Sequence, residues 1–596
     1  MSKQSEQENM LYNWKLEDIY SDENQWEEDY RQIQQLSAQL GIYQGRLGES
    51  GSTLYEVFIL TEKMERMSDK VYVYAKMRQD EDNTNAYYQS LFDRAESLGI
   101  QASSAAAFIV PEILSIPEEK INEFLAEVTE LRKYTHYLDE LKRQKQHVLS
   151  PAEEKLLAET AELSMASRNI FGMLNNADIK FPPIKDENGQ ETEMTKGRFG
   201  RFMESPDREV RKAAFQSLYS SYGKLKNTLG ATINASVKRD IFYARVRKYP
   251  SALAGALDSD NISPAVYDNL ITAVHNNLEP MYKYLRLRKK VLGLDELHMY
   301  DIYTPLVKER PKEIEYETAR EMVLKGLEPL GKAYGDIIRE GFNGGWIDVY
   351  EKEGKTSGAY SWGSYDTHPF ILMNYDNKLD DVFTLAHELG HAMHSYYSNK
   401  NQPFIYSQYS IFLAEVASTV NESLLIEYLL AGSEKKEDKI YLINHYLEQF
   451  KGTMYRQTMF AEFEKIIHAT VEKGDALTPE LLSSIYRELN RLYFGDEVVI
   501  DPEIDLEWSR IPHFYSAFYV YKYATGFAAA TALKEKILKE GKAALDKYMT
   551  FLQAGSSDYS LNILQKAGVD LNTPEPVDQA LNYFAQLVEQ LESLLK

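Results

Sequence analysis

The sequence predicts a mainly α-helical protein of two lobes, with a small β-sheet placed directly before a histidine-rich helix. Helical spacing of apolar residues recurs along most of the chain, two stretches rich in Gly and Pro interrupt it, and no repeat of solenoid length occurs. A chain of 596 residues exceeds one ordinary domain, so we expect more than one structural lobe.

The N-terminal lobe is expected over residues 1–200 and consists mostly of helices. Apolar residues recur there at intervals near 3.6 among many Glu, Lys, Gln and Ala residues, which favour helix. Ser150 followed by Pro151 is typical of a helix start. Prolines and an Asn-Gly turn predict a small hairpin at 179–194. The predicted helices span residues 24–40, 53–80, 86–110, 117–147 and 151–176.

The second lobe, residues 201–596, is expected to be the catalytic domain. Short β-type runs between Gly-rich turns predict a small sheet within residues 346–375. A helix follows it, with Asp380 or Asp381 as the expected N-cap and an end near residue 398. The predicted strands span residues 346–350, 358–362 and 369–375.

Composition narrows the functional classes. The net charge of −24 argues against non-specific nucleic-acid binding and against an anionic membrane surface as partner. No cysteine is present, which excludes disulfides and thiolate chemistry. The N-terminus has no apolar core of signal-peptide length, and the most apolar stretch, 102–116, is too short to cross a bilayer. We therefore expect a cytoplasmic protein without nucleic-acid or membrane partners, and assign no oligomeric state.

The stretch DDVFTLAHELGHAMHSYYS, residues 380–398, gives the strongest chemical signal. His387 and His391 are four residues apart, so both can reach one ion from the same helix face. Glu388 lies one step around the helix, in the H-E-x-x-H arrangement of zinc proteases with Glu as general base. His394 shares the histidine face, but as a third ligand on the same helix it would stretch the geometry. We expect it to support the site instead.

The following segment, YSIFLAEVASTVNESLLIEYLLAG at 409–432, offers a third ligand from another helix. Glu415 stands among mainly apolar neighbours, where an unpaired carboxylate would be costly. Glu422 lies two turns later on the same face. We expect Glu415 to bind the metal and Glu422 to hydrogen-bond a histidine ligand. A solvated acidic stripe is the alternative interpretation.

A peptide substrate must also be held extended beside the metal. PFILMNY, residues 369–375, ends five residues before the histidine helix and could add a peptide backbone as an edge strand. Glycines in the preceding loop would let a backbone approach closely. Ordinary buried strands would explain the same pattern. The expected substrate-binding residues are Gly358, Ala359, Tyr360, Phe370, Ile371 and Leu372.

Late in the chain, IPHFYSAFYVYKYATGFAAATAL at 511–533 combines histidine with regularly spaced tyrosines. Tyr515, Tyr519 and Tyr523 recur every four residues, which predicts one shared helical face, and His513 precedes them. Tyr and His side chains can donate hydrogen bonds to the oxyanion formed when water attacks a carbonyl. Aromatic stripes are also common in cores, so both interpretations stay open.

These four segments, together with NADIKFPPI and the N-terminal WKLEDIYSDENQWEE, closely resemble oligoendopeptidase F, a branch of the thimet-oligopeptidase-like zinc metallopeptidases. The resemblance extends over essentially the whole chain. It implies a clam-like, zincin-type helical fold with an enclosed substrate channel and one zinc ion at its floor. It also implies endopeptidase action on short oligopeptides, because folded proteins cannot enter such a channel.

The resemblance also implies roles for individual residues. The zinc ligands would be His387, His391 and Glu415, and Glu388 would be the base that activates zinc-bound water. The implied transition-state donors are His513 and Tyr523, with Tyr515 or Tyr519 assisting, and Glu422 falls at the place of a supporting acid. Two other functions are weighed: a zinc exopeptidase, such as a carboxypeptidase of related helical fold, and a catalytically silent peptide-binding protein.

Overall fold

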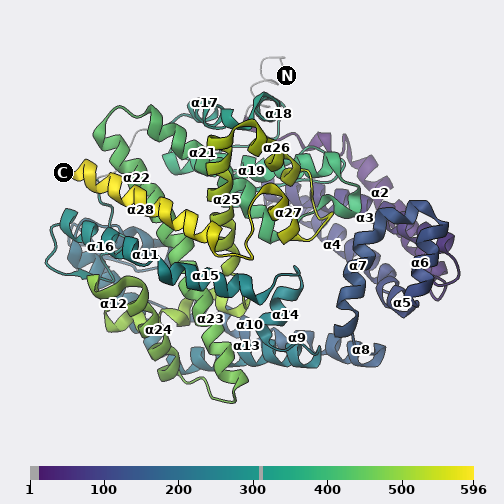
Figure 1. The fold of residues 1–596 in the computed structure, drawn as a ribbon, viewed down its shortest axis with the longest axis horizontal. Coiled ribbons are helices and arrows are strands. Elements are labelled where there is room, and N and C mark those ends of the chain that lie inside the picture. The colour runs from purple at the N-terminus through teal and green to yellow at the C-terminus, as the bar shows by residue number, and fades with distance from the viewer. Residues whose placement is uncertain (1–11, 308–312) are drawn as a thin grey trace. The chain divides into compact units, whose positions relative to one another are not determined.

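The computed structural model describes residues 12–307 and 313–596, and it is mainly α-helical, as the sequence predicts (Figure 1). The chain divides into two compact units, each assembled from three stretches. Unit 1 consists of Met1–Pro151, Pro311–Tyr428 and Leu533–Gly568; unit 2 consists of Ala152–Arg310, Leu429–Ala532 and Val569–Lys596. The two units are defined by which residues pack together. The domain boundary predicted from the sequence at residue 200 stays a prediction.

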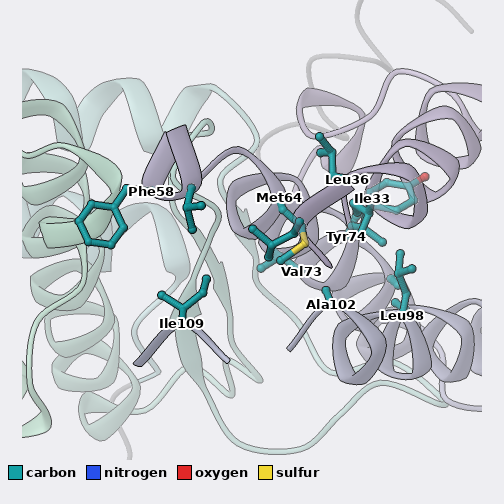
Figure 2. Packing of buried hydrophobic residues seen from close by; sticks show 14 of the residues in the cluster. Ile33, Leu36, Phe58, Met64, Val73, Tyr74, Leu98, Ala102 and Ile109 are labelled. Atoms are coloured by element: carbon teal, nitrogen blue, oxygen red, sulfur yellow. The ribbon is translucent and has the colours of Figure 1, made fainter. Parts of the chain in front are cut away.

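Unit 1 starts with a set of helices that pack around one hydrophobic core (Figure 2). Ile33 of α2, Val73 of α3 and Leu98 of α4 are among its buried members, and each is at most 1% exposed. The helices of this part are α2 (Glu23–Leu40), α3 (Gly51–Glu81), α4 (Ala86–Ala106), α5 (Ile109–Ser115), α6 (Glu118–Glu127) and α7 (Thr135–Gln144).

The prediction of one continuous helix over 117–147 is wrong. Val128 ends α6 in an extended conformation, with φ −114° and ψ 95°, and the 3-10 helix η3 (Thr129–Tyr134) separates α6 from α7. Val128 and Thr129 are adjacent β-branched residues, which lose side-chain freedom in a helix. The helix predicted over 86–110 is likewise divided into α4 and α5.

Within the described residues, one segment is long and apolar enough to pass a membrane-span test of length and composition. It is Ala86–Ser115, which comprises α4 and α5. Leu91, Ala95 and Leu98 of this segment belong to the hydrophobic core. A single such segment is weak evidence for a membrane span.

The small sheet of unit 1 has three strands in the order β4-β6-β5. β6 (Phe370–Leu372) pairs in parallel with β4 (Ile347–Asp348) and antiparallel with β5 (Tyr360–Trp362). All three strands lie where the sequence predicts strands, although each is shorter. The prediction of 369–375 as an edge strand is wrong, because β6 is central and its two sides are both paired; β5 forms an edge instead.

The histidine helix α19 (Leu379–Asn401) follows the sheet and begins before the predicted cap residues. Lys378 occupies the N-cap, so the prediction of Asp380 or Asp381 at that position is wrong. The Asp381 carboxylate nevertheless accepts hydrogen bonds of 2.9 Å from the backbone N–H groups of Asp376 and Lys378. It therefore satisfies donors that the helix start leaves unpaired. The other helices of unit 1 are α17 (Tyr316–Gly326), α18 (Lys332–Asn343), α20 (Phe404–Ser407), α21 (Ile411–Gly432), α26 (Lys542–Leu552) and α27 (Ser560–Ala567).

Unit 2 is also helical and contains the predicted hairpin. β1 (Ile184–Lys185) pairs antiparallel with β2 (Glu191–Thr192), which confirms the hairpin at 179–194. The helix predicted over 151–176 is divided into α8 (Pro151–Glu159), α9 (Ala161–Ser164) and α10 (Ala166–Met173). A short parallel ladder joins β3 (Leu297–His298) to β7 (Val498–Val499).

Most of the remaining chain in unit 2 is helical, and two π-helices, η5 (Leu174–Asp178) and η7 (Lys451–Tyr455), were not predicted. The α-helices are α11 (Lys196–Met203), α12 (Arg208–Lys224), α13 (Lys226–Val246), α14 (Ala252–Asp258), α15 (Pro264–Asn276), α16 (Glu279–Val291), α22 (Lys436–Phe450), α23 (Arg456–Glu472), α24 (Pro479–Phe494), the part of α25 (Tyr521–Glu540) up to Ala532, and α28 (Glu575–Leu595). The 3-10 helices η9 (Pro502–Arg510) and η10 (Pro512–Tyr515) precede α25.

Candidate active site

Two helices of unit 1 bring three potential metal ligands together. His387 and His391 project from α19 and Glu415 projects from α21, and one donor atom of each lies within 4.8 Å of the others. The two Nε2 atoms are 3.1 Å apart, and His387 Nε2 is 3.7 Å from Glu415 Oε2. The three residues are therefore arranged around one small volume.

The close approach of α19 and α21 depends on a glycine that was not among the predicted site residues. A Cβ atom at Gly390 would lie 2.5 Å from Ser418 Cα and 2.8 Å from Ala417 O, which no ordinary packing permits. Asn421 of α21 also donates a 3.1 Å hydrogen bond to the Ala386 carbonyl of α19. An isolated glycine inside a helical pattern often marks such close packing, so this signal was available.

The separations of His387 Nε2 from the other two donors suit a tetrahedrally coordinated cation. Ligand bonds of the length typical for zinc place neighbouring donor atoms about 3.3–3.6 Å apart in a tetrahedron. The observed separations of 3.1 and 3.7 Å bracket that range. Glu388 and Glu422 add two carboxylates nearby, so a divalent cation would also reduce a local excess of negative charge.

Glu422 orients one of the histidines. Its Oε1 lies 2.5 Å from His387 Nδ1, so a proton on Nδ1 is shared with the carboxylate while Nε2 faces the other donors. Burial lowers the pKa of His387, but the hydrogen bond to Glu422 and the charges of Glu422, Glu388 and Glu415 outweigh burial and raise it to about 9. The His387 ring is thus held in the orientation that a metal ligand requires.

The other two histidines of α19 lie in different surroundings. Burial and the neighbouring His387 lower the pKa of His391 to about 3, against the raising effect of a hydrogen bond to the Ala414 backbone. His394 is fully buried and stacks on Tyr409 with 3.6 Å between ring centroids, and neither ring nitrogen has a hydrogen-bond partner among the described residues. It lies outside the group of three donors.

Glu388 is a buried carboxylate with one free oxygen. It is 7% exposed, and its Oε2 has no hydrogen-bond partner in the part of the chain that is described. Burial raises the pKa of Glu388 to about 7, and a backbone hydrogen bond from Ser361 and the charge of His387 only partly oppose this. A carboxylate with a pKa near neutrality and a free oxygen is suited to accept and return a proton.

Glu388 and the three potential ligands border the same cavity. This cavity has a volume of about 470 Å³ and lies entirely within unit 1. One wall is the edge strand β5, and the floor includes successive turns of α19. The lining residues that the site uses are Tyr360, Ser361, His387, Glu388, His391 and Glu415.

The predicted substrate-binding residues fall into two groups. Ala359 and Tyr360 line the cavity, and Gly358 precedes them with a φ of +87°, a conformation that favours glycine. The residues of β6, by contrast, are fully buried inside the sheet. Their backbone groups are used for pairing on both sides, so they offer no free edge to a peptide. This second group consists of Phe370, Ile371 and Leu372.

The aromatic segment of unit 2 is not one helix. Phe518 has a φ of +57°, a left-handed conformation that no helix contains, and α25 begins only at Tyr521. The predicted shared helical face is therefore wrong. The turn nevertheless gathers three of the four predicted residues: the ring of His513 lies 6.4 Å from that of Tyr519 and 6.1 Å from that of Tyr523, measured between centroids.

Tyr515 is separate from this group. Its ring is 2% exposed and stacks on Phe171 with 4.3 Å between centroids. Its hydroxyl forms a 2.7 Å hydrogen bond with the Thr232 hydroxyl. Tyr515 is thus a core residue whose polar atom is satisfied by a local partner.

Comparisons with known proteins cover nearly the whole chain. The profile of peptidase family M3 matches residues 201–583, and that of Oligopeptidase F matches residues 112–181. Oligopeptidase PepF of Bacillus subtilis is 51% identical, with 98% of this chain and 87% of the relative covered. Group B oligopeptidase PepB of Streptococcus agalactiae is 41% identical, with 98% and 97% covered. The crystal structure of oligoendopeptidase-F from Enterococcus faecium has a TM-score of 0.75 at 38% identity, with 96% and 99% covered.

Proposed function

The chain belongs to peptidase family M3 and is a metalloendopeptidase, and we propose that it uses one zinc ion to hydrolyse internal bonds of short oligopeptides. The observation that carries the proposal is the grouping of three donor atoms and the Glu388 carboxyl group around a single cavity. His387, His391 and Glu415 would hold the ion, and Glu388 would handle the proton.

Zinc suits this donor set better than other common divalent cations. Imidazole nitrogens favour zinc over magnesium and calcium, and three protein ligands leave one position open, as catalytic zinc sites do. A zinc ion there would supply Lewis acidity, polarising the scissile carbonyl and lowering the pKa of a water ligand.

Glu388 is the proposed general base and later the general acid. Its carboxylate accepts the proton of the water that attacks the scissile carbonyl carbon, and it then returns this proton to the leaving amine nitrogen. The hydrogen bond from the Ser361 backbone fixes the carboxylate while burial keeps bulk water away. One side chain thus serves both proton transfers.

Glu422 and His394 have supporting roles in this proposal. Glu422 holds the His387 ring by its Nδ1 atom and would so keep Nε2 directed at the ion. His394 stacks on Tyr409, whose hydroxyl hydrogen-bonds Ser395 at 2.8 Å, one turn after His391. His394 therefore stabilises the packing around the histidine helix without itself binding the ion.

We assign His513 and Tyr523 as hydrogen-bond donors to the oxyanion, with Tyr519 assisting. Support comes from their common cluster in unit 2, where all three side chains are partly exposed. Burial lowers the pKa of His513, so the ring is neutral near pH 7 and donates from one nitrogen. Tyr515 is not part of this assignment, because its hydroxyl is used by Thr232.

The edge strand β5 is the proposed seat of the substrate backbone. Among the described residues no strand pairs with its outer side, and Ala359 and Tyr360 line the cavity that contains Glu388. An extended peptide there would bring a carbonyl past Glu388, which lines the same cavity. Relatives named oligopeptidases support a short peptide as substrate, and the enclosed channel and the cytoplasmic location stay predictions.

The test uses peptides of about ten residues blocked at both ends, with products identified by mass spectrometry. We expect internal cleavage that disappears after zinc chelation and returns when zinc is added back. Cleavage that needs a free terminus would contradict endopeptidase action. Full activity in metal-free enzyme, verified by elemental analysis, would contradict the metal assignment.

A further inference from the structure

A buried carboxyl group in unit 2 lies beneath the turn that forms the His513–Tyr519–Tyr523 cluster. Glu464 of α23 has no exposed surface, and its Oε1 accepts a 3.1 Å hydrogen bond from the backbone N–H of Phe518. Its Oε2 is buried and has no partner among the described residues. A buried acid with so few partners is costly, so a specific role is expected.

Phe518 is the turning point of the cluster. Its φ of +57° is rare for a bulky side chain, and it lies between η10, which holds His513, and the start of α25. Because Phe518 lies outside any helix or strand, its inward-pointing N–H needs a side-chain acceptor, and Glu464 provides it.

The Phe518 ring is fixed from two further sides. It packs against the ring of His468, one turn after Glu464 on α23, with 4.5 Å between centroids. The ring of Tyr267 meets it edge-on at 5.9 Å. Phe518 itself is 3% exposed, so ring and backbone are both held by the interior of unit 2.

We propose that Glu464 is a positioning residue for hydrolysis: through Phe518 it holds the turn that sets Tyr519 and Tyr523 against His513. This inference rests on the proposed role of that cluster. Glu464 itself touches neither substrate nor metal ligand. Burial raises the pKa of Glu464 well above its ordinary value, and the charge of Asp240 adds to the effect, so the group acts as a neutral acceptor.

The neutral state suggests a conservative replacement. Glu464→Gln keeps an oxygen for the Phe518 N–H and places its amide NH₂ where the unpartnered oxygen now lies. Glu464→Leu has similar volume but removes the acceptor. Met459→Ala, a buried change on the same helix, is the control for general destabilisation of unit 2.

The experiment measures kcat, KM, zinc content and thermal stability of these variants. Glu464→Leu should lower kcat about 10²-fold while KM stays within about threefold and one zinc per chain is retained. Glu464→Gln should restore kcat to within about threefold of the wild type, because the hydrogen bond is kept. Met459→Ala, although less stable, should keep its kcat.

Two results would overturn the inference. One is a kcat for Glu464→Leu that falls no further than that of Met459→Ala at equal folded fraction. The other is a failure of Glu464→Gln to recover activity. The cluster is tested separately with Tyr523→Phe: if this variant is fully active, the proposed donor role fails. In the double variant with Glu464→Leu, losses that do not add support action through the cluster, and fully additive losses contradict it.

Discussion

The histidine helix of unit 1 and the aromatic turn of unit 2 carry the two proposed halves of the chemistry, yet their geometry has different origins. On α19, helical spacing alone places His387 and His391 side by side, and α21 completes the group with Glu415. In the turn, His513 and Tyr519 come together because Phe518 leaves the helical conformation. The spacing of residues in the sequence is enough to predict the two histidines of the first group. The second group depends on the backbone conformation of one residue, which is stabilised by contacts with residues outside the segment.

The difference shows when a sequence pattern can be trusted. In both segments, polar residues recur every four positions, which favours one helical face. On α19 this interpretation agrees with the structure, since no residue interrupts the helix. In 511–523 the same spacing is misleading, because η10 ends at Tyr515 and α25 begins only at Tyr521.

The largest expected effect tests the histidine helix itself. Glu388→Gln preserves shape but removes the proton acceptor, so we expect kcat to fall about 10³- to 10⁴-fold while one zinc per chain remains bound. Steady-state kinetics on a blocked peptide, with zinc measured by elemental analysis, check this. Substantial hydrolysis by the zinc-loaded variant would contradict the role of Glu388 as proton acceptor, and with it the role proposed for the histidine helix.

The next effect tests the aromatic turn. Tyr523→Phe removes one proposed oxyanion donor, and we expect kcat to fall about 10²-fold with little change in KM. The same kinetics apply, with the melting temperature as a control for folding. A loss confined to KM would indicate a role in substrate binding rather than in transition-state stabilisation.

A smaller effect separates the support of a ligand from the ligand itself. Glu422→Gln weakens the hydrogen bond to His387 Nδ1, so we expect zinc affinity to fall about 10- to 100-fold while kcat at saturating zinc changes little. Competition with a chelator measures the affinity. Glu427→Gln, on the same helix but paired with Lys534, is the matched control and should bind zinc normally. Equal affinities in the two variants would contradict the supporting role.

The smallest effect concerns the tyrosine that the turn leaves in the core. Tyr515→Phe removes a hydroxyl bonded to Thr232, so we expect the free energy of unfolding to fall by about 1 kcal/mol. We expect kcat to stay within about twofold of the wild type, because the hydroxyl is not available to substrate. Denaturant titration and kinetics measure both. A tenfold loss of kcat at unchanged stability would place Tyr515 back with the catalytic tyrosines.

The sequence is sufficient for those features that local rules determine. The helical class, the hairpin at 179–194 and the positions of the three strands all follow from short-range patterns. The order of these strands does not, because which strand is central depends on partners distant in the chain. For the same reason the prediction of an edge strand at 369–375 is wrong. The role of Gly390 was not predicted either, because it depends on the close approach of Ser418.

The central position of β6 has a consequence for how the protein could be shortened. Phe370 and Leu372 belong to the same buried core as Trp14, Trp26 and Leu131, far earlier in the chain. The early helices therefore supply the rest of the buried core that contains β6, the strand with which β5 pairs. A fragment starting at residue 201, where the match to the peptidase profile begins, would expose this interior to water. The minimal active enzyme must then retain the N-terminal helices. If the parts before and after residue 201 were expressed separately, they would have to reassemble around β6.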